Sequence, residues 1–131
     1  MTRVVGAALL LLVVPPLALA GARKLPFSGT YQTTIAGKAS AALDGRWIIS
    51  IAPSGRYGIY KSGRKLVSGT ASTRGTRATF VDQSGRSACR GAQAIGIYRW
   101  RFVSGTLTLT PLSDPCAGRR TVLSTHSLRR L

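Results

Sequence analysis

Acidic side chains are scarce in this chain of 131 residues, which has no Glu and three Asp against 19 Lys and Arg. Chemistry that uses paired carboxylates is therefore disfavoured. One His and two Cys cannot supply the ligands of a common zinc or copper site, so we expect neither a metal nor a cofactor. A serine nucleophile would need His126 as its base, and no Gly-x-Ser-x-Gly segment accompanies it. We expect a binding protein without catalytic residues.

Long apolar runs are also missing, because none reaches the roughly 20 residues that span a bilayer. The longest, residues 4–14, follows the basic Arg3 and is closed by two consecutive prolines. Small residues then lead to a cleavage point after Ala20 or Ala22. This order is typical of a secretory signal peptide over 1–20 and predicts a secreted or cell-envelope location. An uncleaved membrane anchor is the alternative.

Cysteine is limited to Cys89 and Cys116. Two cysteines in a small exported domain most often pair, so we expect a disulfide that stabilises the fold by about 3–4 kcal/mol. The alternative is a reactive thiol with its resolving partner, because the neighbouring Arg90, Arg119 and Arg120 would lower the pKa of a thiol.

Glycine, by contrast, is plentiful and punctuates the chain after Lys24. Short β-rich runs end in Ser-Gly, Asp-Gly or Arg-Gly turns, and no stretch shows the 3.6-residue apolar period of a helix. Gly69 falls inside one run and predicts a bulge or a corner. The expected strands cover residues 28–36, 45–52, 56–61, 64–72, 76–82, 95–103, 105–111 and 119–125.

Eight consecutive strands joined by short hairpins predict an all-β domain over residues 28–125. We expect an eight-stranded antiparallel up-and-down barrel, because closure removes both exposed edges of the sheet. A β-sandwich is the alternative. A short linker over 21–27 would precede this domain, and a C-terminal tail over 126–131 would follow it. We expect a monomer.

Alternation along residues 98–102 assigns the two faces of one strand. Tyr98, Trp100 and Phe102 alternate with Arg99 and Arg101. Side chains two residues apart lie on the same face of a strand. The aromatic rings are therefore expected inside the barrel and the arginines outside it.

Three segments in the C-terminal half carry a resemblance: residues 96–100 (Gly-Ile-Tyr-Arg-Trp), 105–109 (Gly-Thr-Leu-Thr-Leu) and 114–119 (Asp-Pro-Cys-Ala-Gly-Arg). In this order they resemble small exported bacterial lipocalin-like (calycin-type) domains, in which a Gly-x-Tyr-x-Trp strand precedes a Leu-x-Leu strand and an Asp-x-Cys-x-x-Arg turn. Residues 45–47 (Gly-Arg-Trp) and Cys89 fit the same pattern.

The resemblance covers about residues 28–125 and implies a barrel with one mouth that accepts a small apolar or amphipathic ligand. In lipocalins an Arg near the last strand covers a Gly-x-Trp on the first strand. Here Trp47 starts the second expected strand, and Arg119 is the candidate that would cover it.

Aromatic residues on the expected inner faces are the candidate ligand contacts, and the alternative is that they fill the barrel. These residues are Tyr31, Trp47, Tyr57, Phe80, Tyr98 and Trp100.

Arginines on the outer faces are candidate contacts for an anionic surface, namely Arg46, Arg99 and Arg101. A formal net charge of +16 would attract anionic envelope polymers or acidic proteins. The alternative is a solvated basic face, and no motif predicts a specific nucleic-acid partner.

The sequence thus predicts an exported lipocalin-like binding protein with a ligand in the barrel mouth. The alternative is a basic module with a solid core that binds anionic envelope polymers or inhibits a secreted enzyme.

Overall fold

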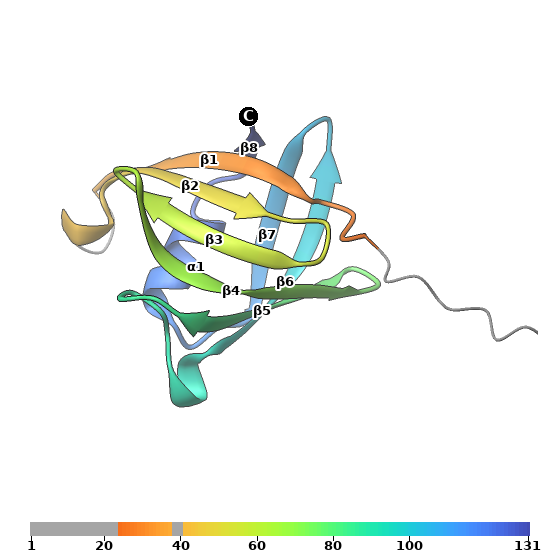
Figure 1. Cartoon of the computed structure of the whole chain (residues 1–131). Helices are drawn as coiled ribbons and strands as arrows, with labels where there is room; N and C mark the ends of the chain where they lie inside the picture. Colours follow the sequence, from red (N-terminus) through yellow and green to blue (C-terminus); the bar gives the residue numbers. More distant parts are fainter. Residues whose placement is uncertain (1–23, 38–40) are drawn as a thin grey trace, which may run out of the picture.

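The computed structural model describes residues 24–37 and 41–131, so the expected signal peptide lies outside the described residues. Eight antiparallel strands form a closed barrel in which each strand pairs with the next and β8 pairs with β1 (Figure 1). The closed up-and-down barrel is therefore confirmed over the β-sandwich. No helix among the described residues has the length and apolar character needed to cross a bilayer.

The first seven expected strands are present, with small shifts at their ends. The strands are β1 (Gly29–Ile35), β2 (Gly45–Ile51), β3 (Arg56–Lys61), β4 (Arg64–Arg74), β5 (Arg77–Ser84), β6 (Ile95–Val103), β7 (Thr106–Ser113) and β8 (Leu128–Arg130). Helical segments are η1 (Ala41–Leu43), η2 (Gly91–Gln93) and α1 (Ala117–Ser124).

The eighth expected strand, at residues 119–125, is wrong. Residues 119–124 belong to α1, and the eighth strand is β8, within the expected tail over 126–131. Arg119, Val122 and Leu123 stand at positions i, i+3 and i+4, and all three are buried. That spacing puts them on one face of a helix, which packs an arginine against the interior together with two apolar side chains.

Gly69 marks a bulge, as the sequence predicts. The register between β4 and β5 shifts between Ser68 and Gly69. A Cβ atom at Gly69 would lie 2.2 Å from the Val81 carbonyl oxygen and 2.5 Å from the Tyr57 hydroxyl. The glycine therefore makes room for the Tyr57 ring as it crosses from β3 towards β5.

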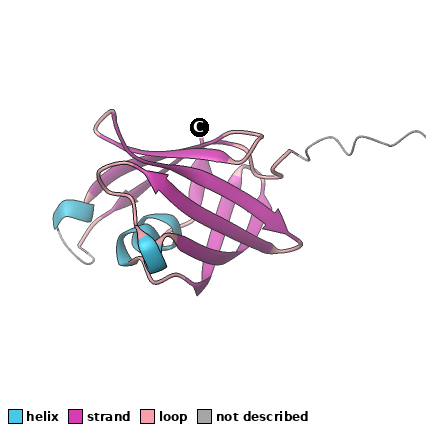
Figure 2. Ribbon diagram, turned by 60° about the horizontal axis from the view of Figure 1, so that its bottom comes forward, coloured by secondary structure: helices cyan, strands magenta, loops and turns pink. Residues whose placement is uncertain are grey.

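The helical segments lie at one end of the barrel, and residues 24–28 lie at the other (Figure 2). We call this the helix end; it also holds the connection between β5 and β6 (residues 85–94). The opposite end, which we call the plug end, holds the turns between β2 and β3, β4 and β5, and β6 and β7.

Residues 24–28 close the plug end, where the sequence predicts a linker over 21–27. Leu25 and Phe27 are buried in the core. The Phe27 ring centroid lies 5.3 Å from that of Trp100, and the Tyr31 hydroxyl donates a 2.6 Å hydrogen bond to the Phe27 carbonyl oxygen. The expectation of a linker over 21–27 is therefore wrong for its described part.

Replacing Phe27 with Ala should lower the free energy of unfolding by about 3–5 kcal/mol, because a fully buried ring would leave a cavity inside the barrel. Urea denaturation of the purified protein measures this change. Lys24→Ala alters an exposed side chain of the same segment and should cost less than about 0.5 kcal/mol. Equal effects of the two substitutions would contradict the role of Phe27 as a plug.

Candidate ligand-binding site

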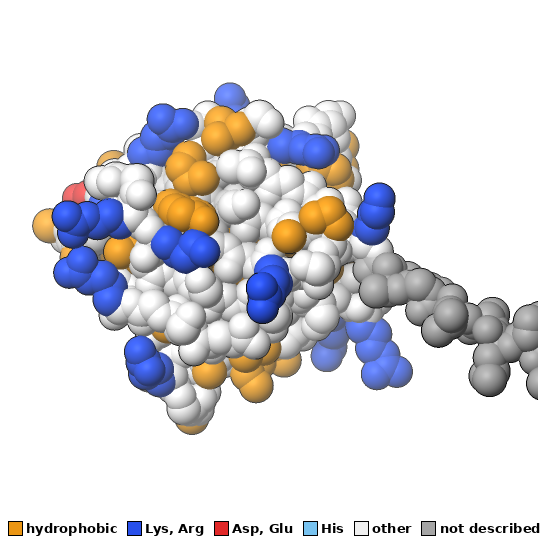
Figure 3. All heavy atoms as spheres, viewed as in Figure 1, with side chains coloured by type: hydrophobic (Ala, Val, Ile, Leu, Met, Phe, Trp, Pro, Cys, Tyr) orange, Lys and Arg blue, Asp and Glu red, His pale blue; other side chains and the backbone are white. Residues whose placement is uncertain are grey.

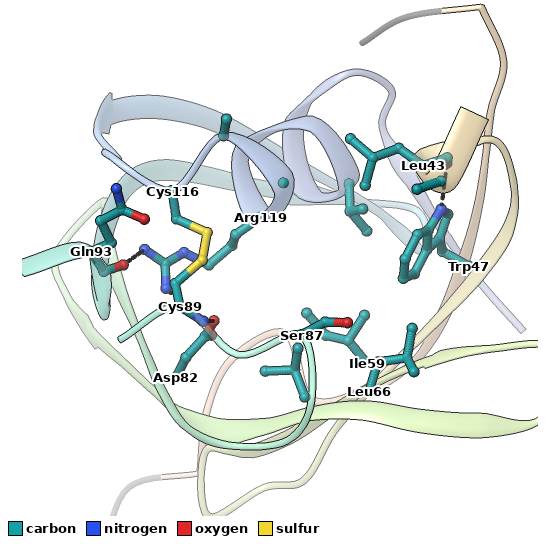
Figure 4. A pocket seen from close by; sticks show the side chains of 15 residues that line it. Leu43, Trp47, Ile59, Leu66, Asp82, Ser87, Cys89, Gln93, Cys116 and Arg119 are labelled. Atoms are coloured by element: carbon teal, nitrogen blue, oxygen red, sulfur yellow. Dashed lines mark hydrogen bonds and ion pairs between the residues drawn. A yellow bond between two sulfur atoms is a disulfide. The ribbon is translucent and has the colours of Figure 1, made fainter. Parts of the chain in front are cut away.

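A cavity of about 400 Å³ opens at the helix end of the barrel (Figure 4). One side of it is apolar, and the other carries the disulfide with several polar side chains. The apolar side chains come from Leu43, Trp47, Ile59, Leu66, Val67 and Val122. The polar side includes Asp82, Gln93 and Arg119, next to Cys89 and Cys116, and Ser87 lies beside Leu66 on the apolar side.

Arg119 is the centre of the polar side. From α1 it reaches between Asp82 on β5 and Asp114, which follows β7. Its guanidinium donates to Asp114 through Nε at 2.9 Å and Nη2 at 2.7 Å, and Nη1 lies 3.3 Å from Asp82 Oδ1. Nη1 and Nη2 also donate to the carbonyl oxygens of Ala94 and Gln93, at 2.8 and 2.9 Å. Every guanidinium nitrogen is thus held by the protein.

Each aspartate also receives a tyrosine hydroxyl. The Tyr57 hydroxyl donates to Asp82 Oδ1 at 2.5 Å, and the Tyr98 hydroxyl donates to Asp114 Oδ2. Burying a charged group is costly unless it is paired and hydrogen-bonded, and here both conditions are met.

The same aspartates hold the backbone of the two cysteines. The Cys89 N–H donates to Asp82 Oδ2 at 2.8 Å, and the Cys116 N–H donates to Asp114 Oδ1 at 2.9 Å. The expected disulfide between Cys89 and Cys116 is present, with a sequence separation of 27 and a Cα–Cα distance of 6.2 Å. It ties the connection between β5 and β6 to the start of α1.

The sulfur atoms and a carboxylate oxygen of Asp82 lie within 4.8 Å of one another, which is the grouping of a small metal site. The thiolate is the form of cysteine that binds a metal, and the disulfide offers none. In the oxidised protein this group is therefore structural.

Burial raises the pKa of Asp114, but its partners outweigh this effect. Hydrogen bonds from Arg119, the Tyr98 hydroxyl and the Cys116 N–H, together with the charge of Arg119, bring the pKa below its ordinary value. The carboxylate form of Asp114 is thus the form that the fold stabilises.

Burial also raises the pKa of the Tyr57 and Tyr98 hydroxyls, and their hydrogen bonds to Asp82 and Asp114 raise it further. Both tyrosines therefore remain neutral donors over the physiological range. They hold the carboxylates in place and are not poised to act as bases.

Gly96 explains the first position of the Gly-x-Tyr pattern. A Cβ atom there would lie 2.6 Å from Asp114 Oδ2 and 2.9 Å from Arg119 Nε. Gly96 and Tyr98 are two residues apart and both buried, so they share the inner face of β6. The glycine makes room for the ion pair, and the tyrosine donates to it.

Among the described residues, Trp47 is the one predicted ligand contact that lines this cavity. Tyr57, Phe80 and Tyr98 instead form an edge-to-face stack inside the barrel, with centroids 5.4 and 5.6 Å apart. Tyr31 is fully buried against the N-terminal segment. The barrel is therefore filled by rings in one half and hollow in the other.

Trp100 lies at the plug end, half-buried, and its indole N–H donates to the Gly75 carbonyl oxygen at 2.9 Å. Its ring packs on Phe27. It therefore helps to close the end opposite the cavity.

The closure of Trp47 by Arg119 that the resemblance suggests is wrong. Figure 4 shows the two side chains on opposite sides of the cavity. Arg119 is engaged by the aspartates and carbonyl oxygens, and the cation over Trp47 is the Lys61 ammonium, 5.1 Å from the ring centroid. The Trp47 indole N–H donates to the Leu43 carbonyl oxygen at 2.9 Å, which fixes η1 at the mouth.

The sequence reasoning missed Asp82 as a site residue, although a signal was present. Asp82 follows Ala78 and Phe80 at intervals of two, so it continues the buried face of β5. A buried carboxylate needs a cation or hydrogen-bond donors inside the barrel. Arg119 is a suitable partner, because its spacing from Val122 and Leu123 puts it on the buried face of a helix.

Of the three arginines predicted to contact an anionic surface, Arg99 and Arg101 lie together on the outside of β6. Arg46 is also exposed, but it lies on β2, four strands away around the barrel. Arg77 on β5, and not Arg46, is the neighbour of Arg99 and Arg101, because it stands directly opposite Arg99 in the register of β5 and β6.

No protein-family model, curated protein or solved structure matches this chain.

Replacing Arg119 with Met should destabilise the protein by about 3–5 kcal/mol, because it leaves Asp82 and Asp114 buried without their cation. Chemical denaturation measures the loss. Arg120→Met is the matched control on the exposed side of α1, where one hydrogen bond to the Asp114 carbonyl oxygen would be lost. If both variants lost equally little, the ion cluster would not stabilise the fold.

Acid should remove the contribution of Asp114. Its pKa is lowered in the folded state, so its stabilisation is present above the unfolded pKa of about 3.9 and is lost as the pH falls towards the folded pKa. Urea midpoints measured across this range should therefore fall more steeply with acid in the wild type than in Asp114→Asn. Identical slopes in the two proteins would contradict the lowered pKa.

Proposed function

We propose that this protein is an exported, non-catalytic binding protein that holds a small amphipathic ligand in the cavity at the helix end, as lipocalin-like barrels do. The cavity itself is the observation that carries this proposal. Its volume of about 400 Å³ falls within the range of small-ligand sites, roughly 300–1,000 Å³. The remainder of the interior is packed with aromatic and aliphatic side chains, so the cavity is not a general looseness of the core.

The two sides of the cavity indicate how such a ligand would lie. Its apolar part would pack against Trp47, Ile59 and Leu66, and its polar part would face the disulfide. Arg119 has no guanidinium nitrogen left for a ligand, so it acts as a fixed wall. Shape and apolar contact would supply most of the affinity, and the polar groups would set the orientation.

The titratable groups beside the cavity support binding over catalysis. The Tyr57 and Tyr98 hydroxyls have raised pKa values, and the two cysteines are joined in a disulfide. A nucleophile or a general base needs a pKa near the working pH or an adjacent activating group.

The disulfide also supports the proposed export. Disulfides persist outside the cytoplasm, where the surroundings are oxidising. The pair formed by Cys89 and Cys116 is compatible with a secreted or envelope protein.

A solid-core module was the alternative from the sequence, and the cavity favours the ligand-binding protein over it. The same barrel does present a strongly basic surface, which is a separate property of its outer wall.

Gly118 offers a way to block the mouth without damaging the fold. It lies in α1 at the edge of the cavity, and a Cβ atom added there meets nothing within 4 Å. Gly118→Leu should therefore fill the mouth, while Gly118→Ala leaves most of it open. Both should leave the helix intact, because Gly118 is in the first turn of α1 and both Ala and Leu form helices more readily than Gly.

The readout is the fluorescence of Trp47 in a Trp100→Phe background, titrated with the neutral amphipathic dye Nile red. We expect saturable quenching with one dye per protein in the Gly118→Ala variant and at least roughly tenfold weaker binding in the Gly118→Leu variant, since the added side chain occupies the apolar mouth. Equal binding by both variants, or no saturable quenching in either, would refute the proposed site.

A further inference from the structure

Four exposed arginines form a continuous strip on the outer wall near the plug end. Arg74 and Arg77 face each other across the turn between β4 and β5, and Arg77 stands opposite Arg99 of β6. Arg101 follows two residues after Arg99 on the same face. We call Arg74, Arg77, Arg99 and Arg101 the arginine strip.

The strip has no acidic neighbour among the described residues. Asp82 and Asp114 are buried with Arg119, and the exposed Asp44 precedes β2 at the helix end. Figure 3 shows the same imbalance on one face of the molecule, where Lys and Arg side chains are widespread and acidic ones are nearly missing. Like charges placed opposite each other destabilise a sheet, so the strip favours a bound anion.

The spacing of the strip suits a chain of anionic groups. Residues two apart on a strand are separated by about 6.6 Å, and neighbouring strands by about 4.8 Å. Thr110 on β7 stands opposite Arg99 and is exposed, so its hydroxyl extends the row of donors. Arginine binds phosphate oxygens through two parallel N–H donors, which makes phosphate the best match.

Aromatic rings are missing from this strip. The rings of β5 and β6 belong to Phe80, Tyr98, Trp100 and Phe102, all on the inner face, where the half-buried Trp100 is held by Phe27 and the Gly75 carbonyl oxygen. Proteins that bind single-stranded nucleic acid combine a basic groove with aromatic platforms on which bases stack. The strip supplies the charge without the platform.

We propose that the arginine strip binds a linear, base-free phosphate polymer of the cell envelope. The disulfide supports a partner outside the cytoplasm, and the strip lies on the outer wall, so this binding is independent of the cavity. A barrel that carries a ligand inside would thereby be held at an anionic surface by its outside.

The test compares two triple variants of equal formal charge. Arg77→Ser, Arg99→Ser and Arg101→Ser together remove three of the four arginines of the strip, and Arg46→Ser, Arg56→Ser and Arg64→Ser together remove three exposed arginines from β2, β3 and β4. The full exported chain is titrated with inorganic polyphosphate of uniform length over a range of salt concentrations. All six side chains are exposed, and thermal unfolding checks that both variants remain folded.

Loss of these three arginines should weaken binding at least roughly tenfold. It should also make the negative slope of log K against log salt shallower by about 2, because each phosphate contact contributes about 0.7–0.9 to the size of that slope. The control variant should lose less than about threefold, through the general field of the protein. A third variant, with Arg77→Lys, Arg99→Lys and Arg101→Lys, keeps the charge and should bind with intermediate affinity, since Lys lacks the paired donors of Arg.

Two outcomes would overturn the proposal. Equal losses in the strip and control variants would mean that binding follows net charge and has no site. Single-stranded DNA with the same number of phosphates, bound more than roughly tenfold more tightly than polyphosphate, would identify a nucleic-acid surface, because stacked bases add affinity that a base-free chain lacks. Neither outcome depends on the cavity, so the proposed ligand site stands or falls separately.

Discussion

One guanidinium holds the helix end of this barrel together. Arg119 binds Asp82 and Asp114, and each aspartate in turn accepts a tyrosine hydroxyl and the backbone N–H of a cysteine. Elements far apart in the chain meet in this cluster: the inner faces of β3, β5 and β6, the end of β7, and α1. A buried charge is tolerated only when it is paired and hydrogen-bonded. Moving one of these elements would leave a buried charge without its partner, so the cluster fixes the elements relative to one another. The cavity has a firm wall for the same reason.

The fold could be predicted from the sequence because its signals are local. Glycines in short turns divide the chain, and alternation along strands such as residues 98–102 assigns inside and outside. The sequence does not predict α1, because the buried face of this helix includes Arg119 and so lacks a fully apolar pattern. Asp114, 5 residues away, is a local partner of Arg119, but Asp82 is 37 residues away in sequence and is brought to Arg119 by the closed sheet.

The site was harder to predict than the fold, for a related reason. The aromatic rings share one face, and the sequence indicates that they lie inside, but it does not say which part of the interior they fill. The N-terminal segment decides this, because Phe27 enters the barrel from one end and packs with the rings there. The cavity lies at the other end, and Trp47 is the one predicted aromatic contact that lines it. The scarcity of acidic residues also shapes the surface. Two of the three aspartates are buried, so the charged side chains left on the surface are almost all basic.

The closure of the sheet depends on very little chain. β8 contributes two residue pairs with β1 and two with β7, and the backbone N–H of Leu131 donates to the Thr30 carbonyl oxygen. The ring of hydrogen bonds is thus completed by the short segment 128–131. If this segment detached, β1 and β7 would become open edges able to pair with another molecule. A substitution that weakens its pairing would therefore favour association between molecules, even though it leaves the apolar interior unchanged.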